Sequence, residues 1–156
     1  MPDWLTHSLI GWIIGKTTKQ EISLLVIGAL IPDITKLYLL FNPITQPMTQ
    51  DFFLPIHTPF GAILIALCIA LFFHEIKKAF IPLTIGIATH FILDFFLLNV
   101  SGGMPLLYPF SWQEWQLGLI RSDDYTITIL ALLAAILVYA FYRIYEKRKI
   151  KKQNNG

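Results

Sequence analysis

Two long apolar stretches, residues 79–98 and 125–145, limit the folds open to this chain more than any other feature. Each has the roughly 20 residues that a helix needs to cross the hydrocarbon core of a bilayer. The composition agrees, because 55% of the residues are hydrophobic and only 14% are charged, whereas soluble domains carry about 25% charged residues. The sequence therefore predicts an all-α integral membrane protein built as a helical bundle.

A third apolar run, residues 60–73, reaches spanning length if its helix begins near Ile56, so we expect about three spanning helices. Residues 4–15 and 22–31 are apolar but only about half as long as a span, which favours a short N-terminal helical hairpin that is buried or re-entrant. Pro32 should end this hairpin, since proline lacks an amide donor and restricts the residue before it.

The remaining segments divide the chain into two parts. A short apolar run covers residues 36–41, and residues 42–55 contain three prolines and are typical of a loop. We expect residues 1–124 to form a helical core with an outer loop at 99–124, and residues 125–156 to form a C-terminal membrane helix and a basic tail. The opening residues MPDWLTHS lack the positive region and cleavage site of a signal peptide.

Lysines and arginines set the expected orientation, because they collect on the cytoplasmic side of a membrane protein. If the turn at residues 75–78 lies inside, alternation of the helices places ten basic residues inside and two, Lys36 and Arg121, outside. The ten are Lys16, Lys19, Lys77, Lys78, Arg143, Lys147, Arg148, Lys149, Lys151 and Lys152. The sequence thus predicts a protein of the cell membrane with a cytoplasmic C-terminus.

Five ionisable residues lie inside or beside the apolar stretches: His7, Asp33, His57, His90 and Asp94. A charged group at the centre of the hydrocarbon core costs roughly 2.5 to 3.5 kcal/mol even on the most lenient scale, so such residues need partners. The expected topology places all five toward the outer ends of their helices, where one site could hold them. The remaining histidine of the chain falls at the opposite end and is excluded from this set.

Each of these residues alone has an ordinary structural interpretation. His90 and Asp94 are four residues apart and share one helical face, which suits two ligands of one ion but also a simple hydrogen bond. Asp33 follows a proline, a pattern typical of a helix N-cap, and His7 and His57 have hydroxyl neighbours that could satisfy them at helix ends. The coincidence of all five on one side favours a shared metal site.

Nitrogen and oxygen ligands without a thiolate suit zinc, and also manganese, iron or cobalt. The single cysteine, Cys68, leaves no material for a cysteine-rich zinc site. Structural zinc takes four protein ligands and catalytic zinc takes three. Five candidates therefore indicate either two ions bridged by a carboxylate, with Asp33 as the natural bridge, or one ion and one residue that supports a ligand without binding the ion.

Several short patterns carry a family resemblance. They are Thr-His-Ser near the start, Gly-x-x-Ile-Pro-Asp-Ile, a central His-Thr, and His-x-x-x-Asp followed by a glycine-containing loop and Leu-Tyr-Pro-Phe-Ser, and they cover residues 5 to about 112. Together they resemble the predicted membrane-bound metal-dependent hydrolases of the YdjM type. Those proteins are in turn similar to the zinc-dependent phospholipase C and P1 nuclease superfamily of helical enzymes.

The resemblance implies a phospholipase C-like core that places Asp33, His57, His90 and Asp94 around one ion, and His7 beside a second ion bridged by Asp33. Asp33, His90 and Asp94 are then the expected catalytic residues. No histidine follows His90 in this chain, so the further ion bound by the soluble enzymes is not expected.

The expected reaction is metal-assisted hydrolysis of a phosphoester. A membrane lipid headgroup is the expected substrate class, since the site should face the outer leaflet. Arg121 in the outer loop is the candidate substrate-binding residue, while Asp123 and Asp124 offer it ordinary surface pairing. Trp112 and Trp115 in the same loop are typical of an interfacial aromatic belt.

Other functions stay open at this stage. Six basic residues from Arg143 to Lys152 favour a metal-stabilised scaffold or adaptor whose tail binds a cytoplasmic partner or anionic lipid. A metal transporter is disfavoured, because no inverted repeat is evident. Nucleic acid is not an expected partner, since the net charge is only +2 and the basic residues are not interleaved with aromatic ones.

Overall fold

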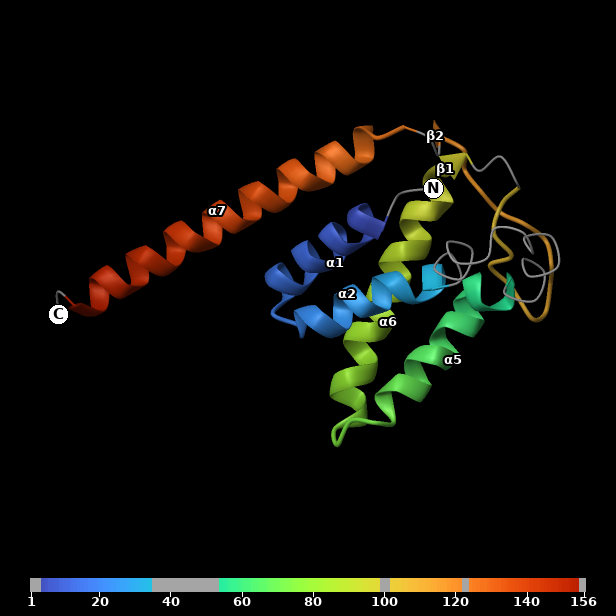
Figure 1. Ribbon diagram of the computed structural model, residues 1–156, viewed down its shortest axis with the longest axis horizontal. Helices are drawn as coiled ribbons and strands as arrows, with labels where there is room; N and C mark the ends of the chain where they lie inside the picture. The colour runs from blue at the N-terminus through green and yellow to red at the C-terminus, as the bar shows by residue number, and fades with distance from the viewer. Residues whose placement is uncertain (1–3, 35–53, 99–101, 122–123, 155–156) are drawn as a thin grey trace.

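The architecture of the chain comes from a computed structural model, which is predominantly helical (Figure 1). The structure describes residues 4–34, 54–98, 102–121 and 124–154. The apolar run expected at 36–41 lies outside these residues, as does most of the expected loop at 42–55.

Helices follow one another along the described chain, and two very short strands lie between the last two of them. The helical elements are α1 (Trp4–Thr18), α2 (Ile22–Leu30), η1 (Ile31–Asp33), η3 (Leu54–His57), α5 (Pro59–Ala70), α6 (Ile76–Phe96) and α7 (Thr126–Asn154). The strands are β1 (Leu97–Leu98) and β2 (Ile120–Arg121). The helical class expected from the sequence is confirmed, and the two strands are an addition that it did not predict.

Among the described residues, two helices are long and apolar enough to cross a membrane: α6, and residues 126–150 of α7. They correspond to the stretches 79–98 and 125–145, so both of these predictions are confirmed as apolar helices of spanning length. α5 has 12 residues and a length of about 18 Å, which is shorter than the helix expected over 56–73. The third span therefore stays a prediction.

The N-terminal hairpin has the expected form. α1 has 15 residues and α2 has 9, and both are too short to cross a bilayer as straight helices. α2 ends immediately before the Ile31–Pro32 pair, where the chain tightens into η1. The helix-breaking role expected of Pro32 is confirmed, and it places Asp33 at the very end of the hairpin.

The apolar core lies between α2, α5 and α6. α5 contributes Ala62, Ala66 and Ala70, which recur every fourth residue and are all fully buried. This spacing places the three methyl groups on one face of the helix, and their small size allows α5 to pack closely against α6. The opposite face of α5 carries exposed apolar side chains such as Leu64 and Leu67.

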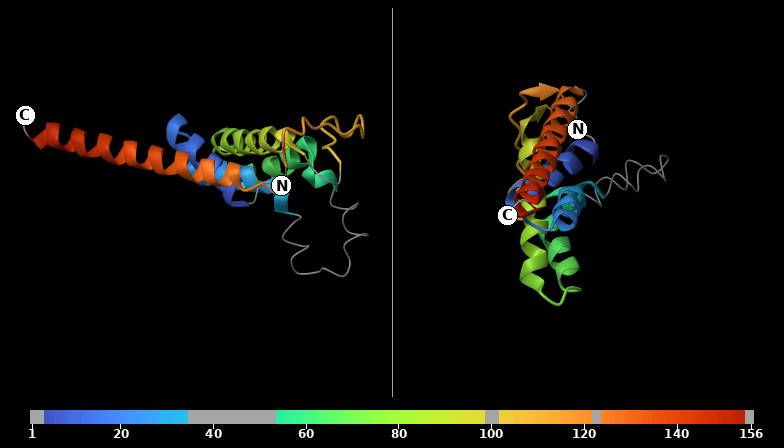
Figure 2. Two further views of the ribbon diagram at one scale, coloured as in Figure 1. Left: turned by 90° about the horizontal axis from the view of Figure 1, so that it is seen from above. Right: turned by 90° about the vertical axis from the view of Figure 1, so that its left-hand side faces the viewer.

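The C-terminal helix α7 packs along α1 and projects beyond the other helices (Figures 1 and 2). Two contacts far apart in sequence fix its direction: the hydroxyls of Thr6 and Thr128 share a hydrogen bond of 2.8 Å, and the Tyr142 hydroxyl donates to the carbonyl of Lys16 at 2.9 Å. α1 and α7 therefore run the same way. Only 11% of the apolar part of α7 is buried within the protein, as suits a helix surrounded by lipid.

The segment between α6 and α7 docks onto the end of α6. β1 pairs in parallel with β2, and the amides of Leu117 and Leu119 donate to the carbonyls of Phe95 and Phe96 at 2.8 and 2.9 Å. Met104 from the same segment is buried in the core. The expected outer loop is thus an ordered structure, in its described part, that packs beside the end of α6.

Candidate metal centre

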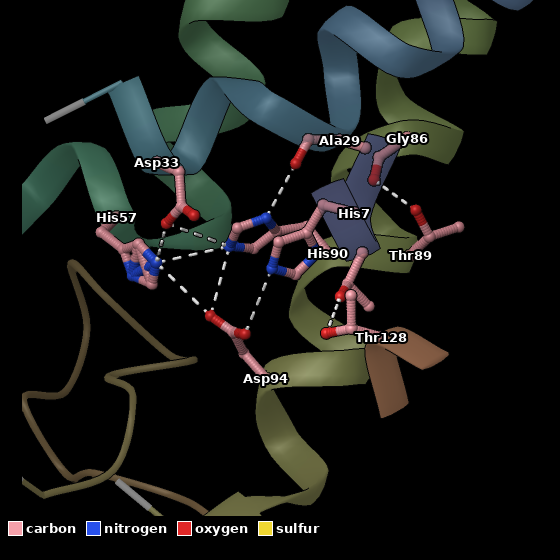
Figure 3. A network of polar contacts seen from close by, with 10 residues as sticks. His7, Ala29, Asp33, His57, Gly86, Thr89, His90, Asp94 and Thr128 are labelled. Atoms are coloured by element: carbon pink, nitrogen blue, oxygen red, sulfur yellow. Dashed lines mark hydrogen bonds and ion pairs between the residues drawn. The ribbon is translucent and has the colours of Figure 1, made fainter. Parts of the chain in front are cut away.

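All five ionisable residues singled out in the sequence converge in one place (Figure 3). They come from four parts of the chain: His7 from α1, Asp33 from η1, His57 from η3, and His90 and Asp94 from α6. Their side chains form two overlapping groups of three that share His90. The first group holds His7, His90 and Asp94, and the second holds Asp33, His57 and His90.

The histidine excluded from the set lies elsewhere. His74 follows α5, at the end of α6 opposite to the cluster, where it lines a surface pocket together with Glu21 and Lys78. The structure therefore confirms that His74 lies apart from the other three histidines.

The cluster is closely spaced and almost completely buried. Asp94 Oδ2 lies 3.2 Å from His90 Nε2 and 3.6 Å from His57 Nε2, and Asp33 Oδ1 lies 3.4 Å from His57 Nε2 and 3.7 Å from His90 Nε2. The two imidazole Nε2 atoms of His57 and His90 are 3.3 Å apart. Four of the five side chains are at most 1% exposed, and His57 is 14% exposed.

His90 has a hydrogen-bond partner that fixes the position of one of its protons. Its Nδ1 lies 2.8 Å from the carbonyl oxygen of Ala29, and because a carbonyl only accepts, this nitrogen must carry a proton. A neutral imidazole carries one proton, so in the neutral ring the Nε2 atom of His90 holds a lone pair. The Nε2 lone pair of His90 therefore faces the carboxylates of Asp94 and Asp33, an arrangement that a cation would stabilise.

The spacing also matches a metal ion. Adjacent ligands of a tetrahedral ion with bonds of about 2.0–2.1 Å lie roughly 3.3–3.4 Å apart. The separations among the facing nitrogen and oxygen atoms run from 3.2 to 3.7 Å and bracket that value. The cluster could therefore hold a divalent ion, and its imidazole and carboxylate donors suit zinc, manganese, iron or cobalt.

His7 extends the cluster on the side away from His57. Its ring stacks on that of His90 with centroids 3.9 Å apart, and its Nε2 lies 3.5 Å from Asp94 Oδ1. Both ring nitrogens are buried without a hydrogen-bond partner among the described residues. Burial lowers the pKa of His7, so the ring is held neutral, the form that binds metals.

Asp94 is the carboxylate that links His7 to the other imidazoles. One oxygen of Asp94 faces His7, while the other faces His57 and His90. Asp94 reaches His7 because a residue four positions after His90 lies on the same face of α6, where the His7 ring stacks. The bridging role expected of Asp33 stays a prediction.

The junction before α5 presents His57 to the cluster. Thr58 is the N-cap of α5: its hydroxyl accepts from the amide of Gly61 at 3.1 Å and donates to the carbonyl of Pro55 at 2.6 Å. Thr58 is fully buried, and its two hydrogen bonds fix the turn that carries the adjacent imidazole. Our sequence interpretation named Thr58 only as a hydroxyl neighbour of His57 and missed its capping role, although Thr-Pro before an apolar run is a typical start of a helix.

The expected substrate-binding residue lies in the outer segment. Arg121 forms part of β2, beside Leu98 at the C-terminal end of α6, and its side chain is exposed. It is thus at the same end of α6 as the cluster. Asp123, one of its expected surface partners, lies outside the described residues.

Fold and site together define a helical membrane protein with a buried cluster of histidines and aspartates. Comparison with known families gives this class a name: residues 3–151 match the family model described as YdjM inner membrane protein. The chain belongs to this family. No curated protein and no solved structure matches it, so the similarity to phospholipase C and P1 nuclease stays a prediction.

Proposed function

We propose that this protein is a membrane-embedded, metal-dependent hydrolase that acts on a phosphoester. The observation that carries the proposal is that His90 Nε2 lies 3.2–3.7 Å from two carboxylates and a second imidazole in a buried interior. Buried carboxylates need a partner of opposite charge, and a cation among these side chains would supply one. Zinc is the first choice, with manganese, iron or cobalt as alternatives.

Each residue then has a role that follows from its position. His7, Asp33, His57, His90 and Asp94 hold one or two ions, and Asp94 is placed to bridge if there are two. A bound divalent ion would lower the pKa of a coordinated water and neutralise charge that develops on a phosphoryl group. Asp33, His90 and Asp94 are the proposed catalytic residues, because they surround the place where the reacting atoms would lie.

The substrate class follows from how the cluster is exposed. His57 is the one ligand with appreciable exposure, so a substrate would approach from its side. The neighbouring segment 102–121 carries exposed apolar side chains, among them Phe110, which is 94% exposed, and Trp112. Aromatic side chains of this kind are enriched at membrane interfaces. A lipid headgroup phosphate is therefore the proposed substrate, with Arg121 as the proposed phosphate-binding residue.

A second candidate function is a metal-stabilised scaffold or adaptor without catalysis. The burial of four of the five ligands favours it, since a closed ion is typical of structural sites. The projecting end of α7 also favours it, because Arg143, Lys147 and Arg148 are exposed along a helix that extends beyond the bundle (Figure 2). Such a helix could bind anionic lipid or an acidic cytoplasmic partner.

Turnover by purified protein separates the two functions. The protein would be prepared in lipid nanodiscs, its metal content measured by elemental analysis, and hydrolysis followed with phospholipids and with a model phosphodiester. The hydrolase predicts metal-dependent turnover that His90→Ala abolishes and His74→Ala leaves intact. His74 is a matched control because it lies at the other end of α6. Bound metal with equal rates for all three proteins would refute catalysis and leave the scaffold.

A further inference from the structure

The contact between α2 and α6 is unusually close. The two helices meet at Gly28 and Gly86, where no side chain separates the backbones. A Cβ atom on Gly28 would lie 2.2 Å from the carbonyl oxygen of Leu83, and a Cβ atom on Gly86 would lie 2.2 Å from the carbonyl oxygen of Leu25. Because the obstructing atoms belong to the backbone, any side chain at either position would force the helices apart.

This contact lies directly beside the ligand cluster on both helices. Ala29 follows Gly28, and its carbonyl accepts the hydrogen bond from His90 Nδ1 at 2.8 Å. His90 comes four residues after Gly86, so the two lie on one face of α6 (Figure 3). Asp33 in turn comes four residues after Ala29, at the end of η1. The distance between α2 and α6 therefore bears on two proposed ligands at once.

We propose that the Gly28–Gly86 contact is a positioning device for His90. By holding α2 close to α6, it lets the Ala29 carbonyl keep the His90 proton on Nδ1, which leaves Nε2 open to a cation. A neutral imidazole carries one proton, so the acceptor offered to Nδ1 decides what Nε2 can do. The inference rests on the proposed metal-binding function, but the position of the proton is a property of the protein without metal.

The expected displacement follows from the contact distances. In Gly86→Ala, the Cβ atom would have to move from 2.2 Å to the 3.4 Å at which ordinary contact with Leu25 begins, so the backbones separate by about 1 Å. A hydrogen bond of 2.8 Å between His90 and Ala29 would then lengthen to about 3.8 Å, which is too long to hold. His90 would lose its fixed tautomer, and Asp33 would move with α2.

Nitrogen NMR of the histidine rings tests this directly, because the ¹⁵N shifts distinguish the two neutral tautomers. The protein would be labelled with ¹⁵N-histidine, treated with a chelator in detergent micelles, and His90 assigned by its loss in His90→Gln. The native protein is expected to show the Nδ1–H tautomer. Gly86→Ala and Gly28→Ala are expected to lose that signature while keeping their helix content, and to bind Zn²⁺ about 10- to 100-fold more weakly.

Gly15→Ala is the matched control. Its Cβ would meet the Ile22 side chain at 2.9 Å, at the junction of α1 and α2 and away from His90, so it should keep both the tautomer and the Zn²⁺ affinity. A native protein with the proton on Nε2 would overturn the inference, as would folded Gly86→Ala and Gly28→Ala variants that keep the Nδ1–H signature. If these variants fail to fold, the native signature decides. Native protein that shows this signature but binds no Zn²⁺ would refute the proposed function and not the positioning of His90.

Discussion

Replacement of Asp94 by asparagine distinguishes two interpretations of the cluster: a metal site, or a group of side chains held together by hydrogen bonds alone. Asp94 contacts His90, His57 and His7 at 3.2, 3.6 and 3.5 Å, so this one carboxylate faces all three imidazoles. Asparagine keeps the shape of the side chain and removes its charge. The variant therefore tests the charge at this position while leaving the packing of α6 almost unchanged.

The magnitude follows from linkage between binding and folding. A metal present at about 1,000 times its Kd stabilises the folded state by about 4 kcal/mol, which raises the Tm of a chain of this size by roughly 8–16 °C. If Asp94→Asn weakens binding by about a thousand-fold, the same metal concentration contributes only about 0.4 kcal/mol. The rise in Tm on addition of metal should then shrink to about 1 °C.

Thermal unfolding in detergent, with and without Zn²⁺ after chelation, measures this difference. Glu75→Gln is the matched control, because the Glu75 carboxylate is exposed at the other end of α6 and pairs there with Lys78. It should keep the full stabilisation by Zn²⁺. An Asp94→Asn protein that also keeps the full stabilisation, or a native protein whose Tm does not respond to any of the candidate metals, would refute the metal centre.

Three further predictions concern neighbouring groups. Thr58→Val removes the N-cap of α5, so it should cost about 1 kcal/mol of stability and lower the Zn²⁺ affinity by moving His57. Thr58→Ser keeps the hydroxyl and should keep both properties. Equal Zn²⁺ affinities of Thr58→Val and the native protein in calorimetric titration would contradict this. Arg121→Ala should raise KM for a phospholipid several-fold and leave kcat unchanged, and a fall in kcat alone would argue against substrate binding. Burial lowers the pKa of His7, so His7 binds its proton more weakly in the folded than in the unfolded protein. The stability of the metal-free, chelator-treated protein should therefore fall as the pH drops below about 6.5. A His7→Asn variant that loses the same stability between pH 7 and 5 would exclude His7 as the cause.

The convergence of the five ionisable residues could be predicted because each is expensive in an apolar surrounding. That cost acts on every residue regardless of its neighbours in sequence, so the alternation of helices alone was enough to bring His7, Asp33 and His57 toward the residues of α6. The short length of α2 could also be predicted, since Pro32 interrupts its hydrogen bonding. In both cases a property of single residues, the cost of burying a charge or the missing amide of proline, favours the same structure as the packing of the whole chain.

The details that sequence could not supply depend on geometry between elements. Which carboxylate lies beside His7 depends on how the His7 ring stacks on His90, and no pattern within α1 or α6 specifies that contact. The docking of Met104 into the core is likewise a long-range event. The length of α5 was within reach, because Thr58 and Pro59 are a typical N-cap and first helical residue, and weighing them would have moved the start of the helix from Ile56 to Pro59.

We predict the direction of the chain through the membrane by combining the two hydrogen bonds between α1 and α7 with the basic residues. Since these helices run the same way, Lys16 lies beside Tyr142 and close to Arg143 in the chain, whereas Thr128 lies beside Thr6, the neighbour of His7. The basic end and the ligand end are thus opposite ends of one structure. Because basic residues stay in the cytoplasm, the ligand end should face outward.

Labelling of intact cells with a membrane-impermeant maleimide tests this orientation. The probe is Phe110→Cys, at a position that is 94% exposed in the outer segment, in a Cys68→Ala background that removes the native thiol. A matched cysteine at Lys149, on the exposed basic end of α7, serves as the control. Labelling of position 110 before lysis and of position 149 only after lysis is expected. The reverse order would place the ligand cluster on the cytoplasmic side, where it could not act on headgroups of the outer leaflet.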